Sequence, residues 1–520
     1  MKNLSKILIA SSLVAFVSCN DEFDHPVDEI HVTAGTADFS RYVALGNSLT
    51  SGYTDNALFR SAQENSYPNI LAQKMAAAGG GEFKIPYMPD DIGGFTNLGV
   101  AGKMILAINP ETGAMGPISM DAVSPFTPAS GGAFGNMGVP GAKSFHLLAS
   151  GYGNPAGIAT GTANPYFARF ASSPTTSVLA DAAAQNPTFF TLWIGNNDVL
   201  SFATSGGSGV NQTGNTDYTT YGPNDISDPQ VVAGSIQIML ETLRNTVGAK
   251  GAIANIPSIT DIPFFTTVPH APLSPANPSF GPMIPTLNQT FGQLNAVFDY
   301  LGVPERKVTF SSDAASAVVI QDETLANLSN QITAVLQSQG LDAGTATILG
   351  MTYGQSRQAN ANDLMLFTSQ TVIGQVDTTR VTQLMGMGVP QEQAVQLSIG
   401  GVTYPLADQW VLIPSERDAV INATNAYNAA IAQLAQQYDV AFIDANASMK
   451  QLSSQAGITY FGTNYTTTYV SGSAFSLDAV HLTAKGYAMI SNYFIDAINL
   501  KYGSTLRNVN PNTYPGVMIP

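Results

Sequence analysis

Four polar residues of this chain have the side chains that an acyl-transfer site requires. Ser48 follows a glycine and an asparagine at the end of the apolar run "RYVALGNS", and Asn197 follows the apolar run "TFFTLWIG". Asp478 stands three residues before His481 in "FSLDAVHLTAKGY". A serine becomes a useful nucleophile when a base takes its proton, and the base needs a carboxylate that orients it. The pattern therefore predicts Ser48 as nucleophile, His481 as base and Asp478 as the carboxylate behind it.

The tetrahedral intermediate of acyl transfer also needs preorganised donors at its oxyanion. Asn197 could supply a side-chain N–H, and Ser48 could supply its backbone N–H. A glycine lets the backbone come close to a substrate, and two segments offer one. "NMGVPGAKS" contains Gly141, whereas "NLGVAGKM" offers Gly102 as the alternative.

Each of these residues also has an ordinary structural interpretation. Ser48 could be a simple turn serine, because Gly-Asn-Ser is common in turns, and His481 could be a surface histidine beside a helix. His146 and His270 have no carboxylate placed as Asp478 is, so we interpret them as structural or surface residues. No pair of histidines has the spacing of metal ligands, and no metal site is expected.

The elements that would position these residues are those of an α/β protein. The strand candidates are nearly continuous apolar runs, as in parallel strands that are covered on both faces. They lie at 41–46, 188–195, 250–256 and 439–445. Apolar residues at helical spacing predict helices over 231–246, from Ser415 onward and from Thr483 onward. Alternating strands and helices predict a parallel sheet, which binds ligands at the carboxyl ends of its strands.

Four segments of the chain resemble the conserved blocks of GDSL/SGNH-type hydrolases, in the order of that family. "GNSLTSGY" resembles block I, "NMGVPGAKS" block II, "WIGNND" block III and "FSLDAVHLTAKGY" block V. The resemblance implies a three-layer α/β/α sandwich, similar to flavodoxin, around a central parallel sheet. It also implies hydrolysis of carboxylic esters through an acyl-enzyme without a cofactor. The residues implied are the nucleophile Ser48, the oxyanion donors Ser48, Gly141 and Asn197, the base His481 and its partner Asp478.

One position departs from the family pattern, because Asn47 stands where block I has an aspartate. Asparagine is nearly isosteric with aspartate and can keep its hydrogen bonds, so we expect activity to survive. A small-molecule or lipid acyl ester is the expected substrate, as in lipases and esterases, and a carbohydrate acetylesterase is the close alternative. A surface binding lipoprotein with a decayed site is the alternative of a different class, and only Asn47 favours it.

The N-terminal segment and the net charge indicate where the chain acts and which class of partner is disfavoured. Lys2 and Lys6 precede the apolar stretch 7–17, and Cys19, the single cysteine, follows it. This pattern resembles a lipoprotein signal peptide over 1–19, with an ordinary signal peptide as the alternative. A lipid on Cys19 would be the only membrane attachment and would place the chain outside the cytoplasm, at the outer membrane or the cell surface. The net charge of −16 argues against nucleic acid as a partner, and the oligomeric state is unknown.

The composition supports a large buried core joined by long loops, since 44% of the residues are hydrophobic and only 11% are charged. The length allows two or three domains or one large domain with insertions. Two stretches rich in glycine, proline or polar residues interrupt the α/β rhythm, and we interpret them as insertions. The later insertion could be a lid or a separate domain. The expected order is a linker at 20–37, a hydrolase domain at 38–503 with insertions at about 79–135 and 262–410, and a C-terminal tail at 504–520.

Overall fold

The computed structural model describes residues 32–108, 113 and 115–519, which form an α/β fold around a five-stranded sheet. The strand order is β11–β6–β5–β1–β4, and every neighbouring pair is parallel. The strands are β1 (Tyr42–Gly46), β4 (Asn136–Gly138), β5 (Phe189–Trp193), β6 (Lys250–Ala254) and β11 (Ala441–Ile443). Because all five are parallel, their carboxyl ends lie along the same edge of the sheet.

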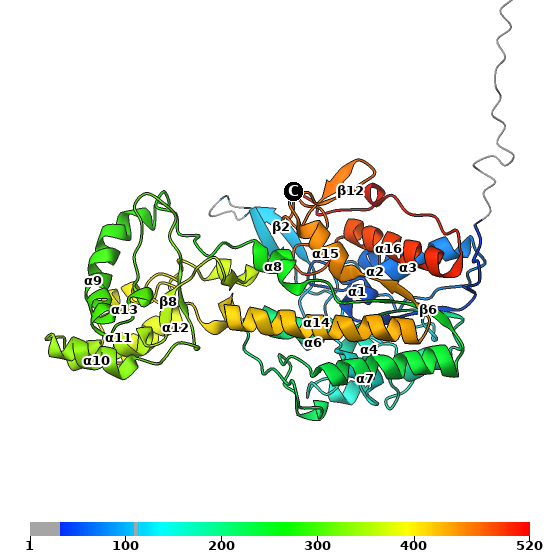
Figure 1. The fold of residues 1–520 in the computed structure, drawn as a ribbon, viewed down its shortest axis with the longest axis horizontal. Helices are drawn as coiled ribbons and strands as arrows, with labels where there is room; N and C mark the ends of the chain where they lie inside the picture. The colour runs from blue at the N-terminus through cyan, green and yellow to red at the C-terminus, as the bar shows by residue number, and fades with distance from the viewer. Residues whose placement is uncertain (1–31, 109–112, 114, 520) are drawn as a thin grey trace, which may run out of the picture.

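Helices cover both faces of this sheet (Figure 1). Successive side chains of a strand point to opposite faces. Val43 and Leu45 therefore pack into the core on one face, and Tyr42 and Ala44 pack into the core on the other. The helices on the first face are α5 (Val178–Ala184), α7 (Pro229–Leu240) and α14 (Pro414–Gln437), and those on the second are α3 (Tyr67–Ala76) and α16 (Ala484–Tyr502).

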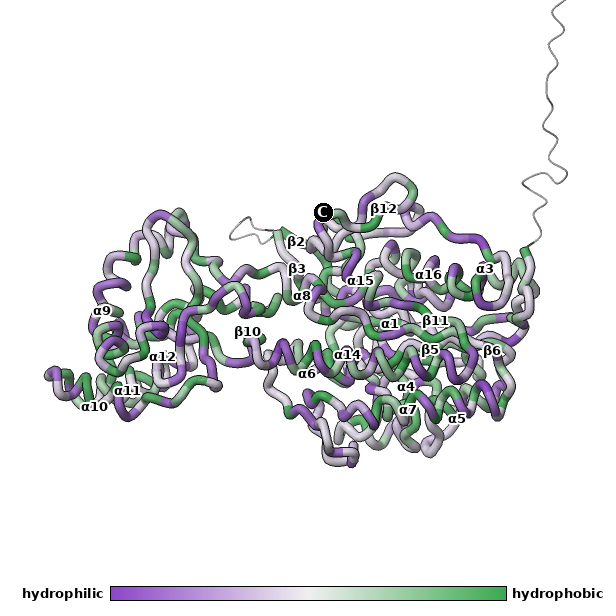
Figure 2. The backbone as a smooth tube through the Cα atoms, in the orientation of Figure 1, coloured by the Kyte–Doolittle hydropathy of each residue, from purple (hydrophilic) through white to green (hydrophobic). Residues whose placement is uncertain are grey.

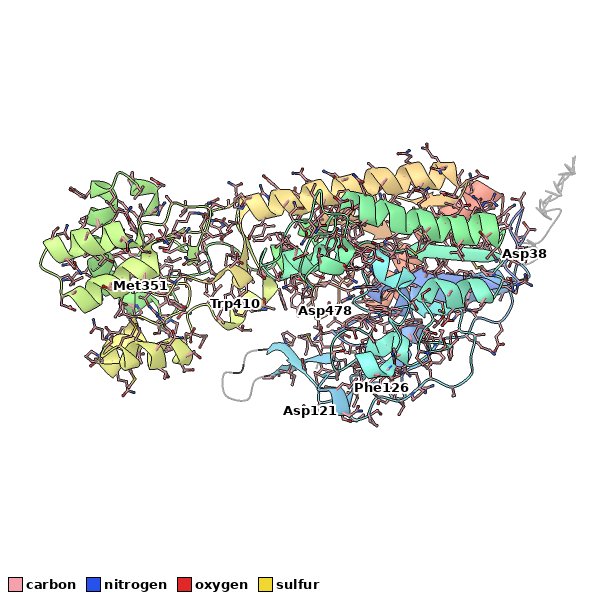
Figure 3. The ribbon with its side chains drawn as sticks, turned by 90° about the horizontal axis from the view of Figure 1, so that it is seen from below. Asp38, Asp121, Phe126, Met351, Trp410 and Asp478 are labelled. Carbon is pink, nitrogen blue, oxygen red and sulfur yellow. The ribbon has the colours of Figure 1, made fainter. Side chains whose placement is uncertain are left out.

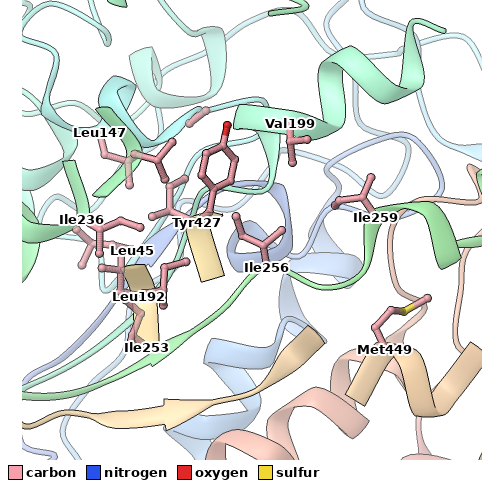
Figure 4. Packing of buried hydrophobic residues seen from close by; sticks show 14 of the residues in the cluster. Leu45, Leu147, Leu192, Val199, Ile236, Ile253, Ile256, Ile259, Tyr427 and Met449 are labelled. Carbon is pink, nitrogen blue, oxygen red and sulfur yellow. The ribbon is translucent and has the colours of Figure 1, made fainter. Parts of the chain in front are cut away.

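The larger of these two cores joins the central strands to the helices above them. Leu45, Leu192 and Ile253 come from β1, β5 and β6, and Ile236 of α7 and Tyr427 of α14 pack over them (Figure 4). None of the five side chains is more than 1% exposed. Burying one aliphatic side chain of this size contributes about 1.5–3 kcal/mol. This packing holds the carboxyl ends of the central strands in place.

The predicted strands and helices are confirmed with shifted boundaries, and within the central sheet one strand was not predicted. That strand is β4, which has only three residues and follows a glycine-rich stretch. The helix expected from Ser415 begins at Pro414, so Ser415 lies inside its first turn instead of capping it. Proline suits the first helical position because its missing N–H would have no partner there. Figure 2 shows polar and apolar residues alternating along this helix, α14, as expected of an amphipathic helix.

Residues 268–413 build a second body, which we call the lobe, beside the sheet (Figure 1). It has its own hydrophobic cluster, which includes Phe291, Val319 and Leu336. Its helices are α9 (Ile284–Tyr300), α10 (Ser329–Ser338), α11 (Ala343–Tyr353), α12 (Thr378–Gly386) and α13 (Gln391–Gln396). Its short strands are β7 (Val319–Gln321), β8 (Ser356–Gln358), β9 (Leu364–Met365) and β10 (Val411–Leu412). The start of the predicted insertion, α8 (Pro263–Thr266), packs into the main core instead.

Outside the lobe, the shorter helices α1 (Ser48–Ser51), α6 (Asn197–Thr204) and α15 (Ala445–Ser453) follow the carboxyl ends of β1, β5 and β11. Two more short helices are α2 (Arg60–Glu64) and α4 (Pro165–Ala168). Two antiparallel hairpins pair β2 (Met104–Ile108) with β3 (Met115–Ser119) and β12 (Ile458–Tyr460) with β13 (Thr463–Tyr465). Among the described residues, no helix is both long enough and apolar enough to cross a membrane.

Both predicted terminal segments pack on the folded body where they are described. Thr36 donates its backbone N–H to the carbonyl of Tyr502, so the end of the predicted linker belongs to the fold. In the predicted tail, Leu506 and Val509 are buried, at 4% exposure each. The predicted signal peptide, with Cys19, lies outside the described residues.

Candidate active site

The turn after β1 is held by close backbone packing and by one side-chain cap. A Cβ on Gly46 would lie 2.3 Å from the carbonyl oxygen of Trp193, so only glycine fits there. The Asn47 side chain accepts from the N–H of Leu49 and thereby caps α1. Ser48 is the first residue of that helix and is 6% exposed. The local sequence thus places the Ser48 hydroxyl at the carboxyl end of β1.

The structure brings Ser48, His481 and Asp478 into one continuous chain of contacts. Ser48 Oγ lies 2.9 Å from Nε2 of His481, and Nδ1 of the same ring lies 2.8 Å from Oδ2 of Asp478. A ring that donates from Nδ1 to the carboxylate leaves Nε2 free to accept the serine proton. The Asp478 side chain is 7% exposed and the His481 side chain 15%. In Figure 3, Asp478 lies at the end of the α/β body that faces the lobe.

Asp478 is held by several donors besides the imidazole. Its Oδ1 accepts from the backbone N–H groups of Val480 and His481 and from the hydroxyl of Ser476. Burial alone would raise the pKa of Asp478, but the charge of His481 and these hydrogen bonds hold that pKa below its usual range. Asp478 is therefore ionised at neutral pH. Ala479, between the two side chains, has φ +63°, a left-handed conformation that is uncommon for a residue with a Cβ.

Two candidate oxyanion glycines have different surroundings in the structure. Gly141 has φ +79°, and a Cβ there would have no atom within 4 Å. Within the described part of the chain, no acceptor binds the Gly141 N–H. Gly102 donates its N–H to the carbonyl of Met120 at 2.9 Å, and a Cβ there would lie 2.5 Å from Ile92. Gly141 thus keeps a free donor, and Gly102 does not.

Asn197 begins α6 at the carboxyl end of β5 and is 8% exposed. Its Nδ2 donates to the carbonyl of Ala142 at 2.9 Å, which ties it to the loop that carries Gly141. An amide nitrogen has two hydrogens, so one stays available after this bond. Asp198 adds a second tie, since its carboxylate accepts from the N–H and the hydroxyl of Ser144.

Sequence reasoning missed a turn that touches the Asp478 loop. The ring of Tyr53 lies 4.7 Å from the ring of His481, measured between centroids. Asp55 and Asn56 follow it, and the Asn56 N–H donates to Oδ2 of Asp478 at 2.8 Å. The dipeptide Asp-Asn was the available signal, because these two residues tolerate left-handed turns. The dipeptide does not indicate that Asn56 would bind Asp478, which lies 422 residues further along the chain.

A scan against protein-family models finds no match for this chain. A search of curated proteins finds none either. The site must therefore be interpreted from its own geometry.

An apolar cavity of about 90 Å³ lies directly beside the Ser48 and His481 segments. Leu49 follows the serine, Val480 and Leu482 flank the histidine, and all three line the cavity. Its other walls come from α15 and α16 and from the ends of β5 and β6. The remaining lining residues are Trp193, Pro257, Ile262, Ala445, Ser448, Met449, Leu452, Ile458, Ala474, Phe475, Gly486, Met489, Ile490 and Tyr493. Such walls suit a hydrocarbon group.

One group of acidic side chains among the described residues is close enough to hold a metal ion. Glu323, Asp408 and Glu416 have carboxylate oxygens within 4.8 Å of one another. Burial and the neighbouring carboxylates raise the pKa of Asp408 to about 6 and that of Glu416 to about 8. Glu416 Oε2 also accepts from the backbone N–H of Ile413. The group lies where the lobe meets α14, and it includes no residue of the Ser48–His481–Asp478 chain.

His146 and His270 are not part of the site. His146 accepts from the backbone N–H of Lys143 and stacks on Tyr152, with centroids 4.7 Å apart. Burial lowers the pKa of His146 to about 4, so it is neutral at physiological pH. His270 lies in the lobe, where its carbonyl accepts from Val318.

Proposed function

We propose that this chain is a serine-dependent hydrolase of carboxylic esters, of the GDSL/SGNH type with the α/β/α architecture of that family. The observation that carries the proposal is the contact chain from Ser48 Oγ to His481 Nε2 and from Nδ1 to Asp478, with distances of 2.9 and 2.8 Å. These residue types in this order are the parts of a nucleophile–base–carboxylate triad.

In the proposed mechanism, Ser48 Oγ attacks the acyl carbonyl carbon while Nε2 of His481 takes the hydroxyl proton. The tetrahedral intermediate collapses, and the protonated ring gives its proton to the departing alkoxide, which leaves as the alcohol. A water then attacks the acyl-enzyme, loses its proton to Nε2 and releases the carboxylic acid. The Ser48 hydroxyl recovers its proton from the ring. Asp478 keeps the ring oriented and stabilises its charged form.

The oxyanion would be stabilised by three donors. The Gly141 N–H supports this role because no described acceptor binds it, and the Ser48 N–H begins a helix, where the first N–H groups have no partner within the helix. Asn197 supplies the hydrogen of Nδ2 that does not bind Ala142. Losing one such donor slows acyl transfer by about 10²–10³-fold.

The apolar cavity favours a hydrocarbon acyl group over an acetyl group on a sugar. A carbohydrate site presents polar side chains to hydroxyl groups, whereas Leu49, Val480 and Leu482, the neighbours in sequence of the proposed nucleophile and base, give this cavity aliphatic walls. A lipid or other acyl ester is therefore the proposed substrate class. The short Ser48–His481 contact argues against a binding lipoprotein with a decayed site, because binding alone does not need this contact.

The test uses the soluble chain without residues 1–19. A fluorophosphonate probe reports an activated serine without assuming a substrate: Ser48 Oγ bonds to phosphorus, fluoride leaves and His481 takes the proton. We expect labelling of the parent and hydrolysis of p-nitrophenyl acetate, butyrate and laurate. Ser48→Ala and His481→Ala should each lower kcat by on the order of 10⁴-fold or more.

Ser66→Ala is the matched control. Ser66 is fully buried, and its hydroxyl donates to the carbonyl of Gln63 and to no residue of the Ser48–His481–Asp478 chain. This variant should keep both labelling and turnover. Labelling and turnover that survive Ser48→Ala would contradict the proposal. A parent that neither reacts with the probe nor hydrolyses any ester would favour the binding lipoprotein.

A further inference from the structure

A two-residue turn beside the triad places two residues other than glycine in left-handed conformations. Thr54 and Ala57 exchange both backbone hydrogen bonds at 3.0 Å, which closes the turn around Asp55 and Asn56. Those two residues have φ values of +50° and +61°. Left-handed conformations are uncommon for residues other than glycine, and surrounding contacts hold them in place. Three of the contacts that hold this turn lead to the Asp478 loop, while the Asp55 carbonyl accepts from the Met104 N–H and the Asn56 carbonyl accepts from the Tyr53 hydroxyl.

The backbone of the turn supports both oxygens of Asp478. The Asn56 N–H donates directly to Oδ2 at 2.8 Å, on the oxygen that also contacts the His481 ring. The Asp55 N–H donates to the hydroxyl of Ser476 at 3.0 Å, and that hydroxyl donates to Oδ1 at 3.0 Å. Neither bond depends on a side chain of the turn.

The Asp55 carboxylate makes the third link. Its Oδ1 accepts from the backbone N–H of Leu477, the residue before Asp478, at 3.0 Å. Asp55 therefore holds the loop from both directions, through its own N–H and through its carboxylate. The loop needs such support, because Ala479 within it has a left-handed φ of +63°.

The charges around Asp55 connect it to the triad. The carboxylates of Asp55 and Asp478 repel each other, while Lys103 and His481 attract the Asp55 charge. Burial is the largest cause that raises the pKa of Asp55 to about 6, and the Asp478 charge adds to it. Tyr469 also faces both carboxylates, and burial raises its pKa, so it stays neutral.

We propose that Asp55 is a positioning residue for the Asp478–His481 pair. The Asp55 carboxylate accepts from the N–H of Leu477 and so fixes the loop that carries Asp478. With the loop fixed, Oδ2 of Asp478 stays in contact with Nδ1 of His481. The other ring nitrogen, Nε2, then faces Ser48. The inference rests on the hydrolase proposed above, and Asp55 itself touches no reacting atom. A displacement of about 1 Å in a catalytic group can cost on the order of 10²-fold in rate.

Two substitutions distinguish the effect of the Asp55 carboxylate from the effect of the turn backbone. Asp55→Gly removes the carboxylate and keeps the turn, because glycine adopts a positive φ without strain and retains the N–H to Ser476. Asp55→Asn keeps an oxygen for Leu477 and removes only the charge. Asn186→Gly is the matched control, since Asn186 is exposed, has φ +48° and lies before β5, at the opposite ends of the strands from Ser48.

We expect Asp55→Gly to lower kcat by about tenfold or more with little change in KM, and to slow fluorophosphonate labelling equally. Asp55→Asn should keep most of the kcat of the parent, because its side-chain oxygen can still accept from Leu477. Because it removes a negative charge that favours the protonated ring, the acid limb of its kcat/KM profile should move to lower pH. The low-field proton resonance of the Asp478–His481 hydrogen bond should persist in Asp55→Asn and weaken in Asp55→Gly. Asn186→Gly should match the parent in every readout.

The outcomes distinguish this inference from the proposed function. A parent that labels and turns over, with an Asp55→Gly variant of equal kcat, equal pH profile and an unchanged resonance, overturns the inference alone. A parent that neither labels nor turns over overturns the hydrolase, and the resonance still tests the positioning. If Asp55→Gly does not fold, Asp55→Asn decides: a folded Asp55→Asn variant that loses both kcat and the resonance, although it keeps an oxygen for Leu477, overturns the inference.

Discussion

Asn47 donates from Nδ2 to Oδ1 of Asn196 at 3.0 Å, and this bond joins the turn after β1 to the turn after β5. The Oδ1 of Asn47 meanwhile accepts from Leu49 at the start of α1. Both functions of the amide are thus used, one as donor and one as acceptor. Asn47, which stands where the motif of the proposed family has an aspartate, is thus a structural link between the segments that carry Ser48 and Asn197.

This link predicts the effect of restoring the motif. Asn47→Asp keeps the acceptor for Leu49, and the Asn196 amide can turn to present its nitrogen to the new carboxylate. We expect kcat within about threefold of the parent, because the geometry of the turn is retained. Asn47→Ala removes both bonds and should lower stability by about 1 kcal/mol or more through the lost helix cap. Urea denaturation measures the loss of stability in Asn47→Ala, and p-nitrophenyl butyrate turnover measures kcat in Asn47→Asp. A large loss of kcat in Asn47→Asp alone would contradict this account.

The two glycine candidates respond to alanine in opposite ways. Gly141→Ala places a Cβ in open space, so the protein should fold with a cost of about 1 kcal/mol from its φ of +79°. Relaxation of that positive φ should move the Gly141 N–H and lower kcat/KM by roughly tenfold or more. Gly102→Ala crowds Ile92, with contacts of 2.5 and 3.1 Å, and should lower Tm while the folded enzyme keeps its kcat. The reverse result would assign the oxyanion donor to Gly102.

Filling the apolar cavity should change chain-length preference. Ala445 is 3% exposed and lines the cavity, so Ala445→Leu should reduce its free volume. We expect laurate turnover relative to acetate turnover to fall by roughly tenfold, since each lost methylene contact costs about 1 kcal/mol or more. Ala497→Leu on α16 is the control, because Ala497 packs in the other core and does not line the cavity. An unchanged ratio in Ala445→Leu would show that the acyl chain lies elsewhere.

The acidic group at the base of the lobe predicts a pH dependence of stability. The pKa of Glu416 rises from its ordinary value of 4.5 to about 8, so the fold favours the protonated form. That stabilisation is complete below pH 4.5 and is lost as the pH rises through about 8. Glu416→Gln keeps an acceptor for the Ile413 N–H and carries no charge. Its Tm should therefore exceed that of the parent by an amount that grows from pH 5 to pH 9.

Glu392→Gln is the control for that experiment, because Glu392 is exposed on α13, away from the acidic group. Its Tm difference from the parent should not change with pH. A constant difference for Glu416→Gln as well would mean that Glu416 is already ionised at pH 5.

Local sequence was enough to find β1, β5, β6 and β11 of the central sheet and to select the residues of the Ser48–His481–Asp478 contact chain. Continuous apolar runs identify β1, β5, β6 and β11, because strands covered on both faces have no polar side to alternate with. The blocks that carry Ser48, Asn197, Asp478 and His481 stand at strand ends or just before a helix, so their neighbours in the sequence indicate their place. The short strand β4 gave no such signal, since three residues carry too little periodicity.

Only the tertiary structure decided which groups share a site and which donors remain free. Gly102 and Gly141 stand in similar sequences, and the difference between them is whether Met120 occupies the N–H. Asp55 and Leu477 lie 422 positions apart, and their hydrogen bond exists because the turn after β1 and the loop before α16 meet at the same edge of the sheet. Local composition specifies elements by their own burial and dihedral preferences. Contacts between distant segments depend on how those elements pack together, which no local pattern records.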